Sequence, residues 1–197
     1  MNRRSALALS LAAAAALFAA CSEQKASFKG IDITGASYAS RLALPDVDGK
    51  ERTLAEFKGK VVIVFFGYVQ CPDVCPATLA EVADVRRKLG ADGARVQPVF
   101  VTVDPERDTA QVLKEYVGNF GPDVVALRAG PEPTLAAAKE FKVYFAKVPG
   151  KTPESYTIDH TAGAFIFDPQ GRVRVFSRYG SGPDALLQDV KLLLAGA

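Results

Sequence analysis

Two apolar segments, Val61–Phe66 and Val96–Val103, dominate the hydrophobic pattern of the chain. Both have the length of a strand and are rich in valine and phenylalanine, which is typical of strands buried on both faces of a sheet. Between them, the apolar residues of segment 76–89 recur every three or four positions, and this period predicts a helix with one buried face. The residues of that face are Leu79, Val82, Val85 and Leu89.

The rest of the chain continues this alternation of strands and helices. Further strands are predicted at Val124–Leu127, Ala164–Phe167 and Val173–Phe176, and further helices at Asp108–Asn119, Pro133–Phe141 and from Gly182 onward. Segment Leu42–Leu54 is predicted to be a hairpin because Asp48-Gly49 is a common turn pair. The carboxylate of Asp108 is predicted to cap its helix. This order predicts an α/β domain with a mixed, mostly parallel sheet flanked by helices.

Two cysteines, Cys71 and Cys75, follow the first buried strand and open the predicted helix. Side chains four residues apart lie on one face of a helix, so the two sulfurs can share one metal ion or form one disulfide. Backbone N–H groups at the start of a helix favour the thiolate, which binds metals and attacks disulfides. A cysteine motif at this place, together with a terminal hairpin, indicates a thioredoxin-like arrangement.

The single histidine of the chain, His160, is a third candidate ligand. It comes shortly before the predicted strand Ala164–Phe167, so a sheet of this kind brings it to the edge where the cysteines lie. Two sulfurs and one imidazole are a ligand set that monovalent copper prefers. Zinc is a weaker candidate because a structural zinc site needs four ligands.

Other interpretations of these three residues stay open. Cys71 and Cys75 could form a structural disulfide, but closing so short a loop removes little entropy from the unfolded chain. They could also form a redox-active pair, although three intervening residues, one more than in the usual redox motif, favour a metal site. His160 could simply form a hydrogen bond at the edge of a strand.

Two aspartates lie beside the candidate ligands and could support them. Asp73 is expected to cap the first turn of the helix or to take part in the site. Asp159 can orient the imidazole of His160 as a hydrogen-bond acceptor. Neighbours on a strand point to opposite faces, however, so Asp159 can equally bond elsewhere. Three tyrosines are expected to pack in the core or at the rim of the site, namely Tyr68, Tyr156 and Tyr179.

The first twenty residues are predicted to be a signal peptide. A positive start is followed by an apolar stretch, residues 5–20, that is too short to span a bilayer comfortably, and small residues precede Cys21. This pattern resembles a bacterial lipoprotein signal, with Cys21 as the lipidated residue; an ordinary secretory signal is the alternative. Residues 21–40 are then a polar tether and residues 41–197 the folded domain.

Charge excludes one class of partner. The chain has 24 basic and 22 acidic residues, and removal of residues 1–20 leaves 22 of each. No basic patch of the kind that binds nucleic acid is therefore expected.

Export would place the domain in an oxidising compartment. Cys71 and Cys75 then form a disulfide by default unless a reductant keeps them available for a metal. We expect the domain to be monomeric.

Several of these motifs together resemble the Sco/SenC family, which handles copper in the assembly of cytochrome c oxidase. The matching stretches are Phe28–Gly35, Gly59–Tyr68, Cys71–Pro76, Val101–Thr109 and Tyr156–Thr161. The resemblance implies a thioredoxin-like fold and copper, as Cu(I), Cu(II) or both, bound by Cys71, Cys75 and His160. Residues 69–70 depart from the family pattern, which more often has Thr-His there, and this leaves the three-ligand set unchanged.

Three functions follow from this interpretation. The first is a copper chaperone that is anchored to a membrane, faces the periplasm or another extracytoplasmic space, and serves the copper-site subunit of the oxidase or another copper carrier. The second is a thiol-disulfide reductase in which Cys71 and Cys75 are catalytic and keep the oxidase cysteines reduced. The third is a thiol peroxidase in which one cysteine attacks the peroxide and the other resolves the product.

Overall fold

The strand Val61–Gly67, labelled β4, lies at the centre of a six-stranded sheet in the computed structural model, which describes residues 27–152 and 155–197. The strand order is β1–β10–β9–β4–β5–β6. The other strands are β1 (Ile31–Asp32), β5 (Val96–Thr102), β6 (Val125–Leu127), β9 (Gly163–Phe167) and β10 (Val173–Arg178). β4 pairs parallel with β5 and antiparallel with β9, so the sheet is mixed.

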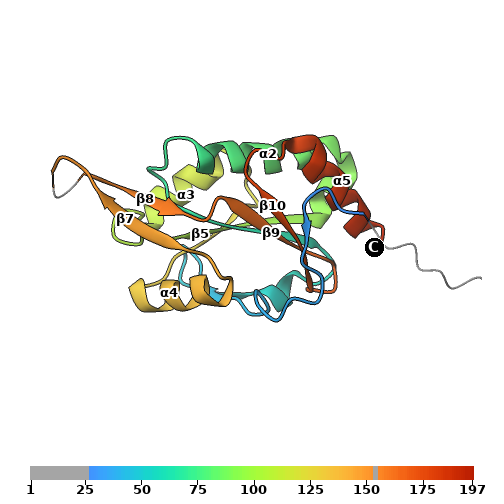
Figure 1. Cartoon of the computed structure of the whole chain (residues 1–197), viewed down its shortest axis with the longest axis horizontal. Coiled ribbons are helices and arrows are strands. Elements are labelled where there is room, and N and C mark those ends of the chain that lie inside the picture. The colour runs from blue at the N-terminus through green and yellow to red at the C-terminus, as the bar shows by residue number, and fades with distance from the viewer. Residues whose placement is uncertain (1–26, 153–154) are drawn as a thin grey trace, which may run out of the picture.

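Helices cover both faces of this sheet. Figure 1 shows α2 (Val74–Lys88), α3 (Ala110–Gly118) and α5 (Pro183–Leu194) on one side and α4 (Pro131–Glu140) on the other. Successive side chains of β4 alternate between these layers. Phe65 packs near Phe100, with ring centroids 6.0 Å apart, whereas Phe66 packs on Phe141 at 5.1 Å. The arrangement confirms the predicted α/β fold of thioredoxin-like type. The sheet is less parallel than predicted, because β4–β5 and β5–β6 pair parallel, whereas β1–β10, β10–β9 and β9–β4 pair antiparallel.

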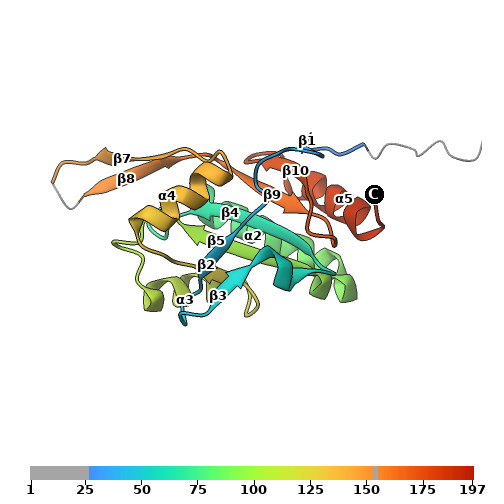
Figure 2. The ribbon, with the colours of Figure 1, turned by 90° about the horizontal axis from the view of Figure 1, so that it is seen from below.

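Two smaller pairs of strands lie outside the central sheet. One consists of β2 (Ala43–Pro45) and β3 (Glu51–Thr53), which pair antiparallel and lead into the 3₁₀ turn Leu54–Phe57. The other consists of β7 (Phe145–Pro149) and β8 (Tyr156–His160), also antiparallel, which extend beyond the body of the domain in Figures 1 and 2. A second 3₁₀ segment, Gly90–Arg95, joins α2 to β5.

The arm formed by β7 and β8 was not predicted. Its strands carry mostly exposed or half-buried residues, and in β8 only Ile158 is fully buried. β8 does alternate between less and more exposed residues, but it has few large apolar side chains, and β7 shows no such alternation. Position 160 was expected in the approach to a strand, and the structure makes it the last residue of one.

The predicted boundary between tether and domain was wrong for the described part of residues 21–40. The buried carboxylate of Asp189 accepts the backbone N–H groups of Lys29, at 2.7 Å, and Gly30, at 2.8 Å. β1 then pairs with β10 at the edge of the sheet. Backbone pairing needs no large apolar side chain, so polar composition alone did not reveal it. The predicted signal peptide and Cys21 lie outside the described residues.

The predicted cap of α3 was also wrong. Thr109 occupies that position, and its hydroxyl accepts the N–H group of Val112 at 3.3 Å. Asp108 is buried instead, and its carboxylate accepts the N–H group of Val69 and the hydroxyl of Thr102. Among the helices of residues 27–152 and 155–197, none has the length and apolar character needed to cross a bilayer.

Candidate metal centre

The two cysteines lie where β4 ends and α2 begins. Cys75 is in the first turn of α2 and is fully buried, whereas Cys71, in the preceding loop, is 9% exposed. The Cys71 sulfur lies 3.4 Å from the backbone nitrogen of Cys75, which donates a hydrogen bond to it. Both are free thiols. The start of the helix therefore presents two sulfurs together, as the sequence predicted.

His160 completes a cluster with these sulfurs. Its Nε2 atom lies 3.4 Å from the Cys75 sulfur, and the three candidate ligand atoms all lie within 4.8 Å of one another. Its Nδ1 atom lies 3.1 Å from the carbonyl oxygen of Thr161. Because a carbonyl can only accept, Nδ1 carries a proton, and Nε2 is the ring nitrogen that faces the sulfurs. The arrangement suits a soft metal ion.

The two thiols share one proton unequally. The pKa of Cys71 is lowered to about 4, chiefly by the hydrogen bond from the Cys75 thiol. Smaller lowering effects come from the backbone N–H of Asp73, from His160 and from the backbone N–H of Cys75, whereas burial of the thiol raises the pKa. The pKa of Cys75 is raised because its thiol is the donor of that bond and because it is buried. Cys71 is thus a thiolate at neutral pH, and Cys75 keeps its proton until a metal replaces it.

Neither aspartate has the supporting role considered for it. Asp73 occupies the N-cap position of α2 but makes no capping bond with its side chain, and its carboxylate accepts the hydroxyl of Tyr179 at 3.2 Å. The Nδ1 atom of His160 bonds to the Thr161 carbonyl, so Asp159, which is exposed, does not orient the ring. The backbone has taken the place of the expected carboxylate.

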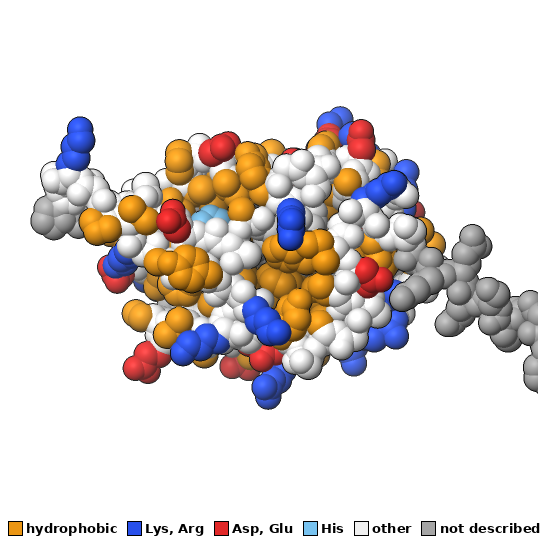
Figure 3. Space-filling view, in the orientation of Figure 1, with side chains coloured by type: hydrophobic (Ala, Val, Ile, Leu, Met, Phe, Trp, Pro, Cys, Tyr) orange, Lys and Arg blue, Asp and Glu red, His pale blue; other side chains and the backbone are white. Residues whose placement is uncertain are grey.

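A cleft of about 310 Å³ opens beside the cluster, between the loop of residues 71–74 and the end of β8, residues 157–160. Of the three candidate ligands, Cys71 and His160 line this cleft, and the Cys75 sulfur lies behind them. Figure 3 shows the single histidine at the surface, next to hydrophobic side chains and an acidic one. A second molecule can therefore reach two of the three residues.

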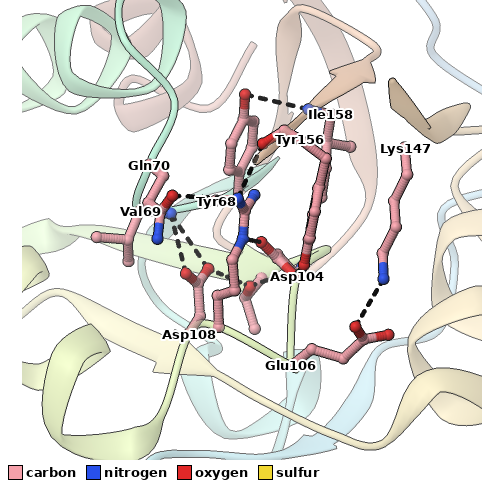
Figure 4. Close-up of polar contacts among 11 residues, drawn as sticks. Tyr68, Val69, Gln70, Asp104, Glu106, Asp108, Lys147, Tyr156 and Ile158 are labelled. Atoms are coloured by element: carbon pink, nitrogen blue, oxygen red, sulfur yellow. Dashed lines mark hydrogen bonds and ion pairs between the residues drawn. The ribbon is translucent and has the colours of Figure 1, made fainter. Parts of the chain in front are cut away.

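A polar network behind the cluster was missed by the sequence analysis (Figure 4). The buried carboxylate of Asp104 accepts the Arg107 guanidinium at 2.5 Å and the Tyr156 hydroxyl at 2.8 Å. The hydroxyl of Tyr68 accepts the N–H group of Ile158 at 3.2 Å. Tyr68 and Tyr156 thus do more than pack at the rim. The available signal was the spacing of an acid and a base, Asp104 and Arg107, in a loop at the carboxyl end of a strand.

Comparison with known proteins points to one family. The family model described as SCO1/SenC matches residues 32–195. The mitochondrial SCO2 homolog of Mus musculus is 37% identical over 131 residues, which cover 66% of this chain and 51% of that protein. The chain spans about half the length of the mammalian relatives that it matches in this way.

Solved structures agree with this result. Bradyrhizobium japonicum ScoI with copper bound is 38% identical, has a TM-score of 0.70, and is matched over 78% of this chain and 98% of its own. The apo Sco1 protein of Thermus thermophilus, solved in solution, is 34% identical with a TM-score of 0.76, over 87% and 99% of the two chains. Arabidopsis thaliana ScoI, also with copper bound, is 32% identical with a TM-score of 0.72 over 80% of this chain and 98% of its own.

Proposed function

The chain belongs to the SCO1/SenC family, and we propose that it binds one copper ion through Cys71, Cys75 and His160 and transfers it during the assembly of cytochrome c oxidase. One observation carries the proposal: two thiol sulfurs and a histidine Nε2 converge within 4.8 Å beside a cleft. The copper-bound relatives ScoI of Bradyrhizobium japonicum and of Arabidopsis thaliana support copper as the metal. The resemblance noted from the sequence supports the oxidase as the destination.

The protonation of the cluster suits capture of a cation. Cys71 is already a thiolate at neutral pH, because hydrogen bonds from the Cys75 thiol and from backbone N–H groups stabilise its charge. Cys75 releases its proton when it becomes a ligand, so copper binding is coupled to the release of one proton. As a ligand, His160 would donate the lone pair of Nε2 to the copper ion, while Nδ1–H stays bonded to the Thr161 carbonyl.

Transfer follows from the unequal exposure of the three ligands. Cys71 and His160 line the cleft, so a thiol of the partner can approach and replace them one at a time. Cys75 is covered by protein and gives up the ion last. Because each departing ligand is replaced by an incoming one, copper is never left without soft ligands. The copper-site subunit of cytochrome c oxidase, or another copper carrier, is the partner in this proposal.

Titration of the reduced, purified protein with Cu(I), in competition with a chromophoric chelator, tests the proposal. We expect one equivalent to bind tightly in the wild type and much more weakly in the Cys71→Ser, Cys75→Ser and His160→Ala variants. Unchanged affinity in His160→Ala would remove that residue from the site. Unchanged affinity in both cysteine variants would refute the proposal.

A thiol-disulfide reductase is the second candidate, favoured by the low pKa of Cys71 at the mouth of the cleft. The Cys71 thiolate would attack a disulfide of the oxidase subunit, and Cys75, once deprotonated, would displace the partner's thiolate from the mixed disulfide. The cysteine pair is oxidised to a disulfide and the partner gains two electrons and two protons. His160→Ala separates the two functions, because it removes a copper ligand and leaves both thiols.

We also place the protein at a membrane facing the periplasm, held by a lipid on Cys21. The folded domain begins by Lys29, whose N–H group is bound by Asp189, so little chain separates Cys21 from the domain. This arrangement confines carrier and oxidase to one surface and raises their effective concentration. A Cys21→Ser protein should move to the soluble fraction; if it stays with the membrane after a high-salt wash, the lipid anchor is refuted.

A further inference from the structure

We propose that Arg107 is a positioning residue, which holds the strand that carries His160 against the loop that carries Cys71 and so fixes the place of the imidazole relative to the sulfurs. The inference rests on the proposed function for the identity of the metal. Its structural part concerns the metal-free protein and can be tested there.

The strand that carries His160 needs such an attachment. β7 and β8 pair with each other, and across the described ranges neither belongs to the central sheet. The cysteines, in contrast, follow directly from β4 at the centre of that sheet. Two of the candidate ligands are therefore built into the body, and the third is brought in by an arm. Contacts between the arm and the body must set the distance between them.

Alternate residues of β8 make these contacts. Tyr156, Ile158 and His160 are two residues apart, so their side chains point to the same face of the strand. The Tyr156 hydroxyl donates to Asp104, the Ile158 side chain is buried, and the His160 ring faces Cys75. Tyr156 and Ile158 therefore attach β8 to the body of the domain, and His160, the last residue of the same row, is placed by these contacts.

One guanidinium joins the two segments that carry the ligands. The Nη1 atom of Arg107 donates to the carbonyl oxygen of Tyr156 at 2.8 Å and to the side chain of Gln70 at 3.1 Å. Gln70 directly precedes Cys71, and Tyr156 lies four residues before His160. The guanidinium also stacks on the Tyr156 ring, with its central carbon 3.5 Å from the ring centroid. It therefore bridges the cysteine loop and the histidine strand.

Asp104 fixes the guanidinium in this place. Its carboxylate is buried and accepts Arg107 Nε at 2.5 Å, while the other oxygen accepts the Tyr156 hydroxyl. A planar, forked cation can bond in several directions and stack at once, whereas a lysine ammonium cannot reproduce this geometry. Arg107→Lys therefore keeps the charge beside Asp104 and loses the bridge.

The single histidine provides a direct measurement in the metal-free, reduced protein, because its ring nitrogens give one set of NMR signals. In Arg107→Met we expect the ring signals of His160 to shift and broaden and the amide of Ile158 to exchange faster with solvent. Arg107→Lys should change the same signals in the same direction. It also carries the test if Arg107→Met does not fold.

Arg86→Met is the matched control. The Arg86 side chain has the same 16% exposure and also pairs with an aspartate, Asp123, at 2.7 Å, but it lies in the last part of α2, away from the cysteines. We expect it to lower stability without moving the His160 signals. If Arg107→Met and Arg107→Lys leave the ring signals and Ile158 exchange as in the wild type, or if Arg86→Met changes them equally, the inference is wrong.

A double-mutant cycle connects the position of His160 to copper. Supporting residues of metal sites typically contribute about 10- to 100-fold in affinity, and we expect Arg107→Met to weaken Cu(I) binding by roughly tenfold. In a His160→Ala background the same substitution should change the affinity less than about twofold, since Arg107 acts through that imidazole. An equal loss in both backgrounds would overturn the inference. Failure of the wild type to bind copper would refute the proposed function and leave the NMR result standing.

Discussion

Gly67 lies directly against the sulfur of Cys75: a Cβ atom at this glycine would come to 2.7 Å from the sulfur and to 2.8 Å from the ring of Phe65. β4 ends at Gly67, so the strand stops where the buried thiol needs room. The absence of a side chain there allows α2 to pack its first turn onto the sheet. The position of the Cys75 sulfur thus depends on Gly67, eight residues earlier in the chain.

Gly67→Ala should therefore displace Cys75 and destabilise the domain. Overpacking of a close-packed core costs roughly 1–3 kcal/mol, and here the ring of Phe100 would also be 3.0 Å away. Gly118→Ala is the control, because no atom lies within 4 Å of its Cβ position at the end of α3 and the change should stabilise by about 0.4–1 kcal/mol. Urea denaturation of both variants measures the difference. Equal stability of the two would contradict this account.

The low pKa of Cys71 should depend on Cys75, whose thiol is the first cause of the lowering. In Cys75→Ala the pKa should rise, so alkylation of Cys71 at pH 6 should become slower than in the wild type. Cys75→Ser is the matched control, because its hydroxyl can still donate a hydrogen bond to the thiolate. The pH profile of alkylation, followed by mass spectrometry, gives the pKa directly. Identical profiles for Ala and Ser would show that other groups hold the thiolate.

The ionisation of Cys71 should make the metal-free protein more stable as pH rises. The folded pKa of Cys71 lies below its value in the unfolded chain, so its contribution is complete above the unfolded pKa and is lost as pH falls toward about 4. The metal-free protein should therefore gain stability from pH 5 to pH 8 relative to Cys71→Ser. Denaturation midpoints at the two pH values test this, and a constant difference between the proteins would contradict it.

Asp189 should hold the start of the domain without influencing the metal centre. It is buried and accepts the N–H groups of Lys29 and Gly30. Asp189→Ala should cost about 1–3 kcal/mol, because two backbone donors lose their acceptor. Hydrogen exchange should rise at residues 29–33 while Cu(I) affinity stays within about twofold. Asp189→Asn, which keeps one acceptor oxygen, should have a smaller effect. A large loss of copper affinity would show coupling that the structure does not suggest.

The sequence was sufficient for elements whose residues are buried in a regular pattern. β4, α2, β5 and the pairing of β9 with β10 follow from apolar runs and helical spacing, and the cysteines were located because they lie between two such elements. The arm of β7 and β8 was missed because nearly all of its side chains are exposed or only half-buried. The sequence could name His160 as a candidate but not the strand that carries it.

The supporting contacts were harder to predict, because each joins residues that are distant in sequence. Arg107 and Tyr156 are 49 positions apart, and the Nδ1 partner of His160 is a backbone carbonyl, which no side-chain motif reveals. Asp108 shows the limit clearly. Its local context is that of a helix cap, yet its carboxylate binds Val69 across the end of the sheet. The local sequence predicts that a side chain caps α3, but tertiary contacts determine that Thr109, and not Asp108, does so.

Oxidation of Cys71 and Cys75 should abolish copper binding and leave the fold intact. A disulfide requires a sulfur–sulfur distance of about 2.05 Å, so one sulfur must move from its present place. Cys71 is the one that can move, since it lies in a loop at the edge of the cleft, whereas Cys75 is packed against Gly67. The core is formed by β4, β5 and the helices around them, and it does not depend on that loop.

The oxidised protein should therefore have the circular dichroism of the reduced form and bind no Cu(I), because both thiolate ligands are consumed. Its His160 ring signals should shift, since the Cys75 sulfur, 3.4 Å from Nε2, changes from a thiol to a disulfide sulfur. A reductant should restore both properties, and a Cys71→Ser, Cys75→Ser double variant treated with the same oxidant should show no change. Unfolding on oxidation would mean that the cysteine loop stabilises the domain. Persistent copper binding would mean that the ligands lie elsewhere.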